Sequence, residues 1–254
     1  MNRHDRRAAE KTNGHAPPAQ RPPAIILAVP SSGFWKAKMA ADAISTSVWA
    51  AIHGIYIEVR AAEGAYTESN RNNIVRAALN YQHPIDALMW LDSDMRVPAD
   101  TIARLWGHGK DIVGAVYRER AAPYHYLGKF CDEDDAETKA GLKPMELMPG
   151  GVIMVKMDVY RALPFPWYKL DEDGLRDDYY FTNMAREAGY EVWCDMGLTV
   201  RVAHRGEDDV GWFDEGRIVA RGGRDDPRVS KIPSLTGRAE PERRIAEAGT
   251  GVRQ

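Results

Sequence analysis

This sequence of 254 residues has few cysteines, no long apolar run and fewer basic than acidic side chains in its central part. Two cysteines, Cys131 and Cys194, without a CxxC spacing argue against a disulfide scaffold or a cysteine-based zinc site. No apolar run approaches the roughly 20 residues that cross a bilayer, so no transmembrane segment is expected. The opening segment, MNRHDRRAAEKTNG, is basic but lacks the apolar stretch of a secretory signal. We therefore expect a cytoplasmic protein.

Positive net charge is confined to the two ends of the chain. The formal net charge is -3, but residues 1–23 and residues 221–254 each carry +3, which leaves -9 on residues 24–220. An acidic body is a poor nucleic-acid surface, because phosphate binding needs clustered Lys and Arg. If the body binds an anionic substrate, something must offset its charge, and a divalent cation is one candidate.

Composition divides the chain into three parts. Residues 1–23 contain four prolines and almost no large apolar side chain, which is typical of a flexible basic arm. Residues 222–254 mix Gly, Pro and charge and predict a polar tail. Residues 24–221 are predicted to form one domain.

Short apolar strands alternate with helical patterns in the first half of this domain. Strands are predicted at 24–30, 55–59, 86–94 and 111–117. Helices are predicted at 36–53, from a cap at Ser69 or Asn70 through Tyr81, and after Pro98. This βαβαβαβ order predicts a parallel sheet with helices on both faces.

The second half is less regular. Residues 118–148 are predicted to be a long loop region, followed by strands at 150–156, 190–195 and 198–204 and a helix at 177–188. The whole predicts an α/β fold whose open mixed sheet is mostly parallel, with an appended, partly antiparallel half.

Ligands of open parallel sheets bind beyond the carboxyl ends of the strands, which directs attention to Asp92-Ser93-Asp94. Two such carboxylates after a buried strand suit Mg²⁺ or Mn²⁺, which in turn bridge nucleotide phosphates. An acidic turn that caps the next helix is the alternative.

Other candidate residues are individually ambiguous. Asp177 and Asp178 open a helix, where they either cap it or supply a general base. His204 ends a predicted strand and is either a metal ligand or a half-buried polar residue. Gly150-Gly151 either admits a ligand close to the backbone or forms a turn. Arg71 and Asn72, near a helix start, suit a phosphate or lie on an exposed surface.

Taken in order, these segments resemble glycosyltransferases of the GT-A fold, in particular family 2-like enzymes and short glycosyltransferase-like proteins of phages and bacteria. The matching pieces are AIILAVPSSG, SNRNNIVRAAL, ALMWLDSDMRVPADTIARL, DIVGAVYRER, MPGGVIMVKMDVYRAL, DDYYFTNMAREAGYEVWCD and VAHRG. They span roughly residues 24–206. The resemblance implies a Rossmann-like sheet and transfer of a sugar from a nucleoside-diphosphate donor, such as a UDP- or GDP-sugar, to a hydroxyl acceptor of unknown identity.

The resemblance also assigns roles. It implies Asp94 as the direct metal ligand, Asp92 near the ribose or a metal-bound water, and His204 completing the metal site, with Mn²⁺ or Mg²⁺ as the ion. Asp178 matches the catalytic base of inverting members, and Asp177 stands where Glu is more usual. The remaining matches concern nucleotide-sugar binding and fall on Pro30, Ser31, Glu58, Arg71, Asn72, Asp92, Ser93, Gly150 and Gly151.

Two other functions fit an acidic α/β protein. A nucleotidyltransferase usually has a Gly-rich, basic loop after the first strand, whereas PSSGFWKAK contains one glycine. A catalytically silent sugar- or nucleotide-binding accessory protein of a phage is the other alternative. The presence of Asp92, Asp94, Asp178 and His204 together argues against it.

Overall fold

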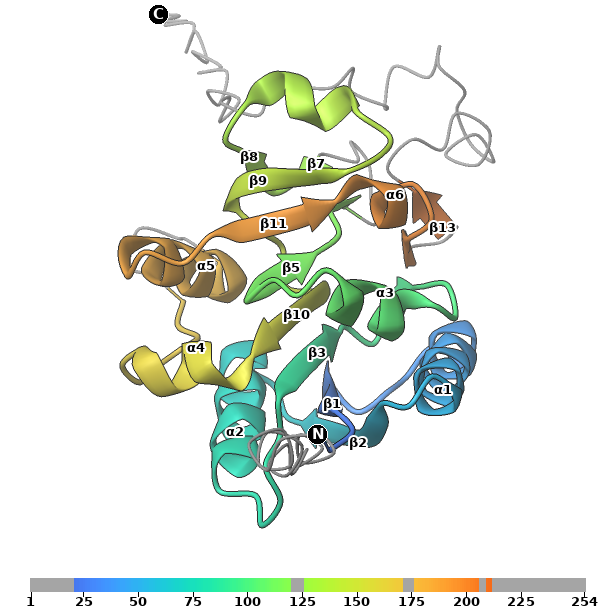
Figure 1. Cartoon of the computed structure of the whole chain (residues 1–254), viewed down its shortest axis with the longest axis vertical. Helices are drawn as coiled ribbons and strands as arrows, with labels where there is room; N and C mark the ends of the chain where they lie inside the picture. Colours follow the sequence, from blue (N-terminus) through green and yellow to red (C-terminus); the bar gives the residue numbers. More distant parts are fainter. Residues whose placement is uncertain (1–20, 120–125, 171–175, 206–208, 212–254) are drawn as a thin grey trace, which may run out of the picture.

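The computed structural model describes residues 21–119, 126–170, 176–205 and 209–211. Most of the predicted basic arm and the whole predicted polar tail lie outside these residues. An eight-stranded sheet forms the centre, with strand order β2-β1-β3-β10-β5-β11-β9-β8 (Figure 1). Its strands are β1 (Ala24–Ser31), β2 (Tyr56–Glu63), β3 (Ala87–Leu91), β5 (Ile112–Gly114), β8 (Lys129–Phe130), β9 (Leu142–Leu147), β10 (Val152–Lys156) and β11 (Val192–Asp195).

The sheet is mixed. β1 pairs in parallel with β2 and β3, and β5 pairs in parallel with β11, whereas β10 enters antiparallel between β3 and β5. β9 is antiparallel to β11 and to β8. Six of the eight strands therefore run in one direction, and β9 and β10 run opposite. The predicted fold class, an open mixed α/β sheet flanked by helices, is confirmed.

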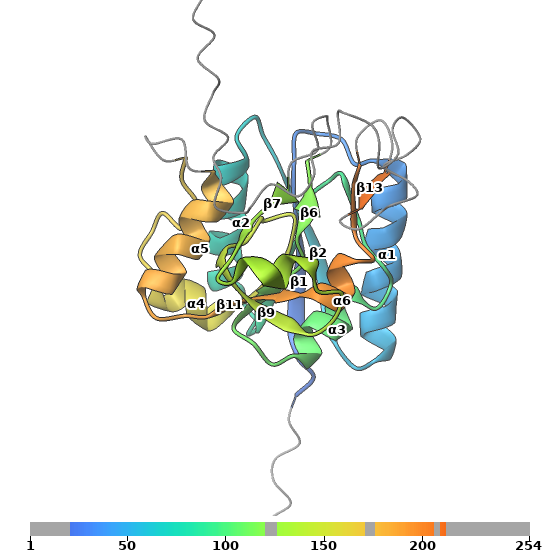
Figure 2. The same ribbon diagram turned by 90° about the horizontal axis from the view of Figure 1, so that it is seen from above.

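Helices cover both faces of the sheet (Figure 2). One face carries α1 (Ala37–Ile52), α3 (Thr101–Gly107) and α6 (Met196–Thr199), and the other carries α2 (Thr67–Leu79), α4 (Met157–Ala162) and α5 (Asp177–Glu187). β1 and β3 alternate between two apolar cores, with Ile26 and Trp90 in one and Leu27 and Met89 in the other. Of the described helices, none has the length and apolar character to cross a membrane.

Smaller elements close the carboxyl edge of the sheet. β4 (Met95–Arg96), β12 (Ala203–Arg205) and β13 (Asp209–Gly211) form a three-stranded sheet, and β6 (Tyr117–Arg118) pairs with β7 (Tyr126–Leu127). A 3-10 helix spans Glu133–Glu137.

Several sequence predictions need correction. The segment 118–148, predicted to be a loop, contributes β8 and β9 to the main sheet. Pro144 and the lysines at 129 and 143 interrupt the apolar pattern that a sheet strand usually has. The predicted strand at 198–204 is wrong in its first part, because the Asp195 side chain accepts a hydrogen bond from the Leu198 N–H and caps α6. α2 begins at Thr67, so Ser69 and Asn70 lie inside its first turn and cap nothing.

The helix α1 is present, but its packing face is not the one its large apolar residues mark. Met39, Ala43, Thr46 and Ala50 are buried against the sheet. Ile44, Val48 and Ile52, whose spacing predicts the helix, are 65%, 56% and 70% exposed. Small side chains on the inner face let the helix approach the sheet closely, which leaves the larger residues outside.

Candidate functional site

A cavity of about 490 Å³ opens at the carboxyl edge of the sheet, beyond β1 and β3. The turns after β1, β2 and β3, the first turns of α2 and α5, and side chains from β6 and β12 surround it. Its lining residues are Pro30, Ser31, Ser32, Gly64, Ala65, Thr67, Arg71, Asp92, Ser93, Asp94, Tyr117, Glu119, Leu127, Arg176, Asp177, Asp178 and His204. The position follows the rule for open α/β sheets that ligands bind beyond strand carboxyl ends.

Arg71 of α2 is a buried cation at the base of this cavity, with a side chain only 2% exposed. Its Nη2 donates to Asp92 Oδ1 at 2.8 Å, and its Nη1 donates to the Gly150 carbonyl at 3.1 Å. Its Nε lies 3.2 Å from Asp177 Oδ2. Burial alone would lower the pKa of Arg71, but Asp92 and Asp177 outweigh it and raise that pKa above its usual value. The guanidinium thus holds two acidic residues from separate elements in fixed positions.

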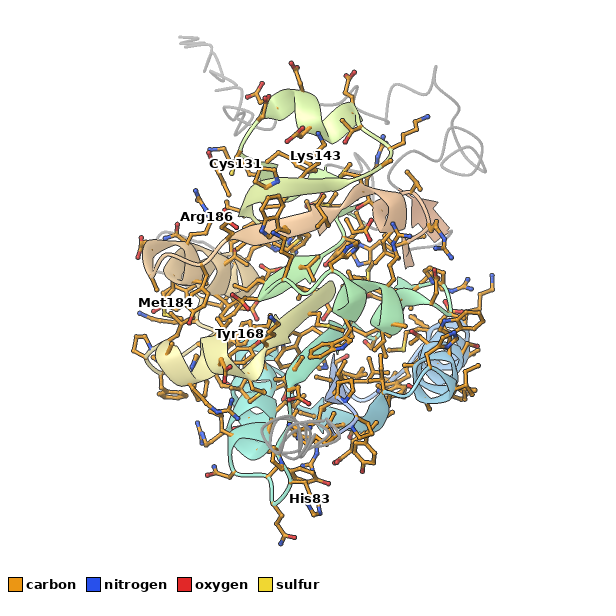
Figure 3. The ribbon with its side chains drawn as sticks, in the orientation of Figure 1. His83, Cys131, Lys143, Tyr168, Met184 and Arg186 are labelled. Atoms are coloured by element: carbon orange, nitrogen blue, oxygen red, sulfur yellow. The ribbon has the colours of Figure 1, made fainter. Side chains whose placement is uncertain are left out.

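Aromatic side chains support Arg71 from below. Its guanidinium carbon lies 5.2 Å from the Trp90 ring centre and 5.5 Å from that of Tyr168. Tyr168 lies between α4 and α5 (Figure 3), where its ring stacks on Phe181 and its hydroxyl contacts the Tyr160 hydroxyl at 2.7 Å. Arg71 is therefore packed against buried aromatic rings as well as paired with carboxylates.

Asp178, in the first turn of α5, is held by two backbone groups. Its Oδ2 accepts from the Gly150 N–H at 2.8 Å and its Oδ1 accepts from the Tyr179 N–H at 2.9 Å. Burial, and then the neighbouring charge of Asp177, raise the pKa of Asp178 to about 6. A carboxylate with such a pKa suits proton transfer near neutral pH.

Asp94 and His204 meet on another side of the cavity. His204 Nε2 lies 3.4 Å from Asp94 Oδ2, and His204 Nδ1 donates to the Arg118 carbonyl at 2.8 Å. That carbonyl fixes the proton on Nδ1, so the lone pair of a neutral ring remains on Nε2, on the side of the carboxylate. A histidine oriented by a backbone carbonyl and paired with a carboxylate fits a divalent cation.

Asp92 is set apart from this pair, because Oδ1 is engaged by Arg71. Burial raises the pKa of Asp92, whereas Arg71 opposes that shift. Within the described ranges, no group of three His, Cys, Asp or Glu side chains is arranged to hold a metal ion. The two-residue pair of Asp94 and His204 is therefore the part of the predicted metal set that the structure brings together.

Gly150 and Gly151 lie directly beneath these side chains. A Cβ on Gly150 would lie 2.8 Å from Arg71 Nη1 and 2.9 Å from Asp178 Cβ. A Cβ on Gly151 would overlap the Tyr117 hydroxyl, which accepts from the Gly151 N–H at 2.7 Å. The predicted glycine pair does not line the cavity itself; it lets Arg71, Asp178 and Tyr117 pack onto the backbone.

Two predicted binding residues lie away from the cavity. Glu58 is not at the end of its strand, because β2 continues to Glu63, and its Oε1 is paired with Arg60 Nε at 2.6 Å. Asn72 is buried, with its Nδ2 donating to the Tyr168 carbonyl and its Oδ1 accepting from the Trp167 and Tyr168 N–H groups. Asn72 thus anchors the segment that carries Tyr168. Four other residues of the predicted binding set line the cavity, namely Pro30, Ser31, Arg71 and Ser93.

Sequence reasoning missed Tyr117, Glu119 and Arg176, which also line the cavity. Tyr117 follows the apolar strand DIVGAV, and its ring centre lies 5.2 Å from that of His204. Arg176 directly precedes Asp177 and Asp178 in the sequence. That position could have predicted a cation at this edge of the sheet. With these residues included, five carboxyl side chains and two guanidinium groups face one cavity.

No protein-family model matches the chain, and no curated protein matches it. Among solved structures, it is similar to A197 from STIV with a TM-score of 0.54 and 15% identity, over 83% of this chain and 98% of that chain. A glycosyltransferase involved in the glycosylation of the major capsid of PBCV-1 aligns with a TM-score of 0.34 and 13% identity, over 55% of this chain and 63% of that chain. The likeness to A197 shows a shared fold, and the second likeness is too low to support an argument.

Proposed function

We propose that this protein is a cation-dependent glycosyltransferase that moves a sugar from a nucleoside-diphosphate donor to a hydroxyl acceptor. The observation that carries the proposal is the meeting of Asp178 with the Asp94–His204 pair around one cavity at the carboxyl edge of the sheet. The order of the motifs along the chain, which resembles family 2-like enzymes of the GT-A fold, supports the same function.

Charge supports the need for a cation. The cavity has five carboxyl side chains and only two guanidinium groups, those of Arg71 and Arg176, so its excess negative charge would repel a diphosphate. Arg71 is already paired with Asp92 and Asp177. Asp94 and His204 would hold a divalent ion, Mn²⁺ or Mg²⁺, and that ion would offset the charge of the donor diphosphate. Arg176 lies at the same cavity and would add a second positive charge.

Asp178 is proposed as the general base. Its carboxylate would take the proton of the acceptor hydroxyl while that oxygen bonds to the anomeric carbon and the bond to the diphosphate oxygen breaks. The products are the glycoside and the nucleoside diphosphate, and a single displacement inverts the anomeric carbon. Asp177, held at Arg71, would keep the first turn of α5 in place.

The direct test is to incubate the protein with UDP- and GDP-sugars and Mn²⁺ and to measure free nucleoside diphosphate, because transferases of this kind can hydrolyse their donor slowly without acceptor. Hydrolysis of one donor that stops on chelation of the ion supports the proposal. Release of pyrophosphate from a nucleoside triphosphate would instead indicate a nucleotidyltransferase, and binding without turnover a silent binding protein.

Two variants separate the proposed roles. Asp94→Ala should abolish metal-dependent donor binding, measured by calorimetry with and without Mn²⁺. Asp178→Asn should keep donor binding and reduce transfer about 10²- to 10⁴-fold. Asp158→Asn, whose side chain is 87% exposed on α4, is the matched control and should change neither. Equal loss of donor binding in Asp94→Ala and Asp178→Asn would contradict this division.

A further inference from the structure

The outward side of α1 is an apolar surface that the proposed function does not use. Its exposed residues are Ala37, Lys38, Ala41, Ile44, Ser45, Val48, Trp49, Ala51 and Ile52; we call the seven other than Lys38 and Trp49 the outer face of α1. After Lys38 no exposed residue of this helix is charged, because Asp42 is turned to Arg96 at the side of the helix. A helix with two apolar sides normally has both of them covered.

Both views place α1 at the periphery of the molecule, with no described element outside it (Figures 1 and 2). Ile44, Val48 and Ile52, with Trp49 at 40% exposure beside them, present on the order of 400 Å² of apolar surface, which is the size of the largest and often functional patch on a monomer. Val59 of β2 is 47% exposed on the same side of the sheet, since Ile57, two residues earlier, packs into the core under α1.

The relief of the outer face is self-complementary. Ile44, Val48 and Ile52 follow one i, i+4 row and would form a ridge. The small residues Ala37, Ala41 and Ser45 follow the adjacent row and would form a shallow groove that ends at the exposed Trp49. A two-fold axis brings the ridge of one copy into the groove of the other, so a single surface serves both partners. Two copies would bury about 1,000 Å² once the neighbouring alanines are included, which meets the minimum of roughly 1,000 Å² that a biological interface needs.

We propose that this protein forms a two-fold dimer through the outer face of α1. A lipid surface fits less well: interfacial helices present Lys and Arg along a polar side, whereas the inner side of α1 is packed on the sheet and its outer face is uncharged.

The test is the oligomeric state of the full chain by sedimentation equilibrium at about 50 µM, well above a micromolar dissociation constant. The wild type is expected at twice the chain mass of 28.4 kDa. Val48→Glu should weaken association at least about 100-fold, because the two-fold axis places two unpaired carboxylates in the interface. Val200→Glu, a matched change at a residue 40% exposed beyond α6, should leave the dimer intact.

Three results would overturn the proposal. In the first, the wild type is a monomer that binds phosphatidylcholine vesicles and Val48→Glu abolishes that binding, which would assign the outer face to lipid. Another is a monomer whose unfolding temperature Val48→Glu lowers by several degrees, which would mean that the chain's own residues cover this face. The third is a dimer that Val48→Glu leaves unchanged, which would place the interface elsewhere.

Discussion

Arg71 determines the electrostatics of the cavity at the scale of single residues. It is charged, buried and in contact with Asp92, Asp177 and the Gly150 carbonyl, so its removal would leave carboxylates without a partner. Asp178 is half-buried, and its burial and the charge of Asp177 raise its pKa to about 6 although Arg71 opposes that shift. Asp92 and Asp177 are paired with Arg71, whereas Asp178 keeps a pKa suited to proton transfer.

The raised pKa of Asp178 predicts the acid limb of the reaction. A general base acts only when ionised, so kcat/KM for transfer should fall tenfold for each pH unit below about 6 and level off above it. The measurement is kcat/KM between pH 4.5 and 8 with the ion kept saturating, and with donor binding followed in parallel. Loss of donor binding over the same pH range would assign the limb to binding instead of to the base.

The residues that sequence could identify are those whose position along a strand or helix dictates where they lie. Asp92 and Asp94 follow a buried strand, and Asp178 opens a helix, so their arrival at one edge follows from topology. The structure places Glu58 and Asn72 away from the cavity, and the sequence could not show this because it depends on register. β2 continues four residues past the predicted strand end at 59, and Asn72 lies one position along α2 from the cavity-lining Arg71. Tyr117 was missed because a tyrosine after an apolar strand is equally typical of a core.

At the scale of elements, the turn between β9 and β10 supports the site through its two glycines. Gly151→Ala would force its Cβ against the Tyr117 hydroxyl and to 3.1 Å from Asp92 Oδ2, and the hydrogen bond from the Gly151 N–H to Tyr117 would be lost. We expect a loss of about 1–3 kcal/mol in the free energy of unfolding, together with weaker donor binding. Denaturant unfolding and calorimetry measure the two effects.

Gly107→Ala is the matched control for that substitution. Gly107 lies at the end of α3 with open space where a Cβ would stand, so alanine should be neutral or slightly stabilising there. If Gly151→Ala proves as neutral as Gly107→Ala, the backbone at Gly151 can shift away from Tyr117 and the proposed support is wrong.

The helices and strands that sequence predicts well are those with a single possible packing face. β1 and β3 are buried on both sides, and their continuous apolar runs predict both strands, although β3 ends at Leu91 and not at Asp94. α1 offers two apolar sides, and periodicity alone cannot decide which one meets the sheet. The segment 198–204 is rich in β-branched residues, yet the cap from Asp195 and the fit of Leu198 into the core make its start helical.

At the scale of the whole molecule, the structure shows where part of the negative charge of residues 24–220 lies. Five of the carboxyl side chains in this range face one cavity, whereas others are neutralised in surface pairs such as Lys143–Asp135 and Arg201–Asp100. Surface pairs of this kind contribute little to stability. Two of the cavity acids, Asp92 and Asp178, are costly to the folded state without a ligand, since burial disfavours their ionised forms and raises their pKa values.

That cost makes the stability of the ligand-free protein depend on pH. The pKa of Asp178 is about 6 in the folded state and 3.8 as its ordinary value, so the folded state binds the proton more tightly than the unfolded state. The stabilisation by that proton is fully present below about pH 4 and is lost as pH rises through 6. The difference between the two pKa values corresponds to on the order of 3 kcal/mol, and the raised pKa of Asp92 acts in the same direction.

The substitution Asp178→Asn isolates this contribution, because it removes the titrating group and keeps the shape of the side chain. The amide faces two N–H donors and carries its own cost, but that cost is the same at every pH. We therefore expect urea unfolding between pH 4 and 8 without divalent ions to show a pH-dependent difference in the free energy of unfolding. As pH rises, the stability of Asp178→Asn relative to the wild type should increase by on the order of 3 kcal/mol. Asp158→Asn, on an exposed side chain, should follow the wild type throughout. A constant difference between Asp178→Asn and the wild type would mean that Asp178 ionises in the folded protein as easily as in the unfolded chain, and its assignment as a base poised near neutral pH would then fail.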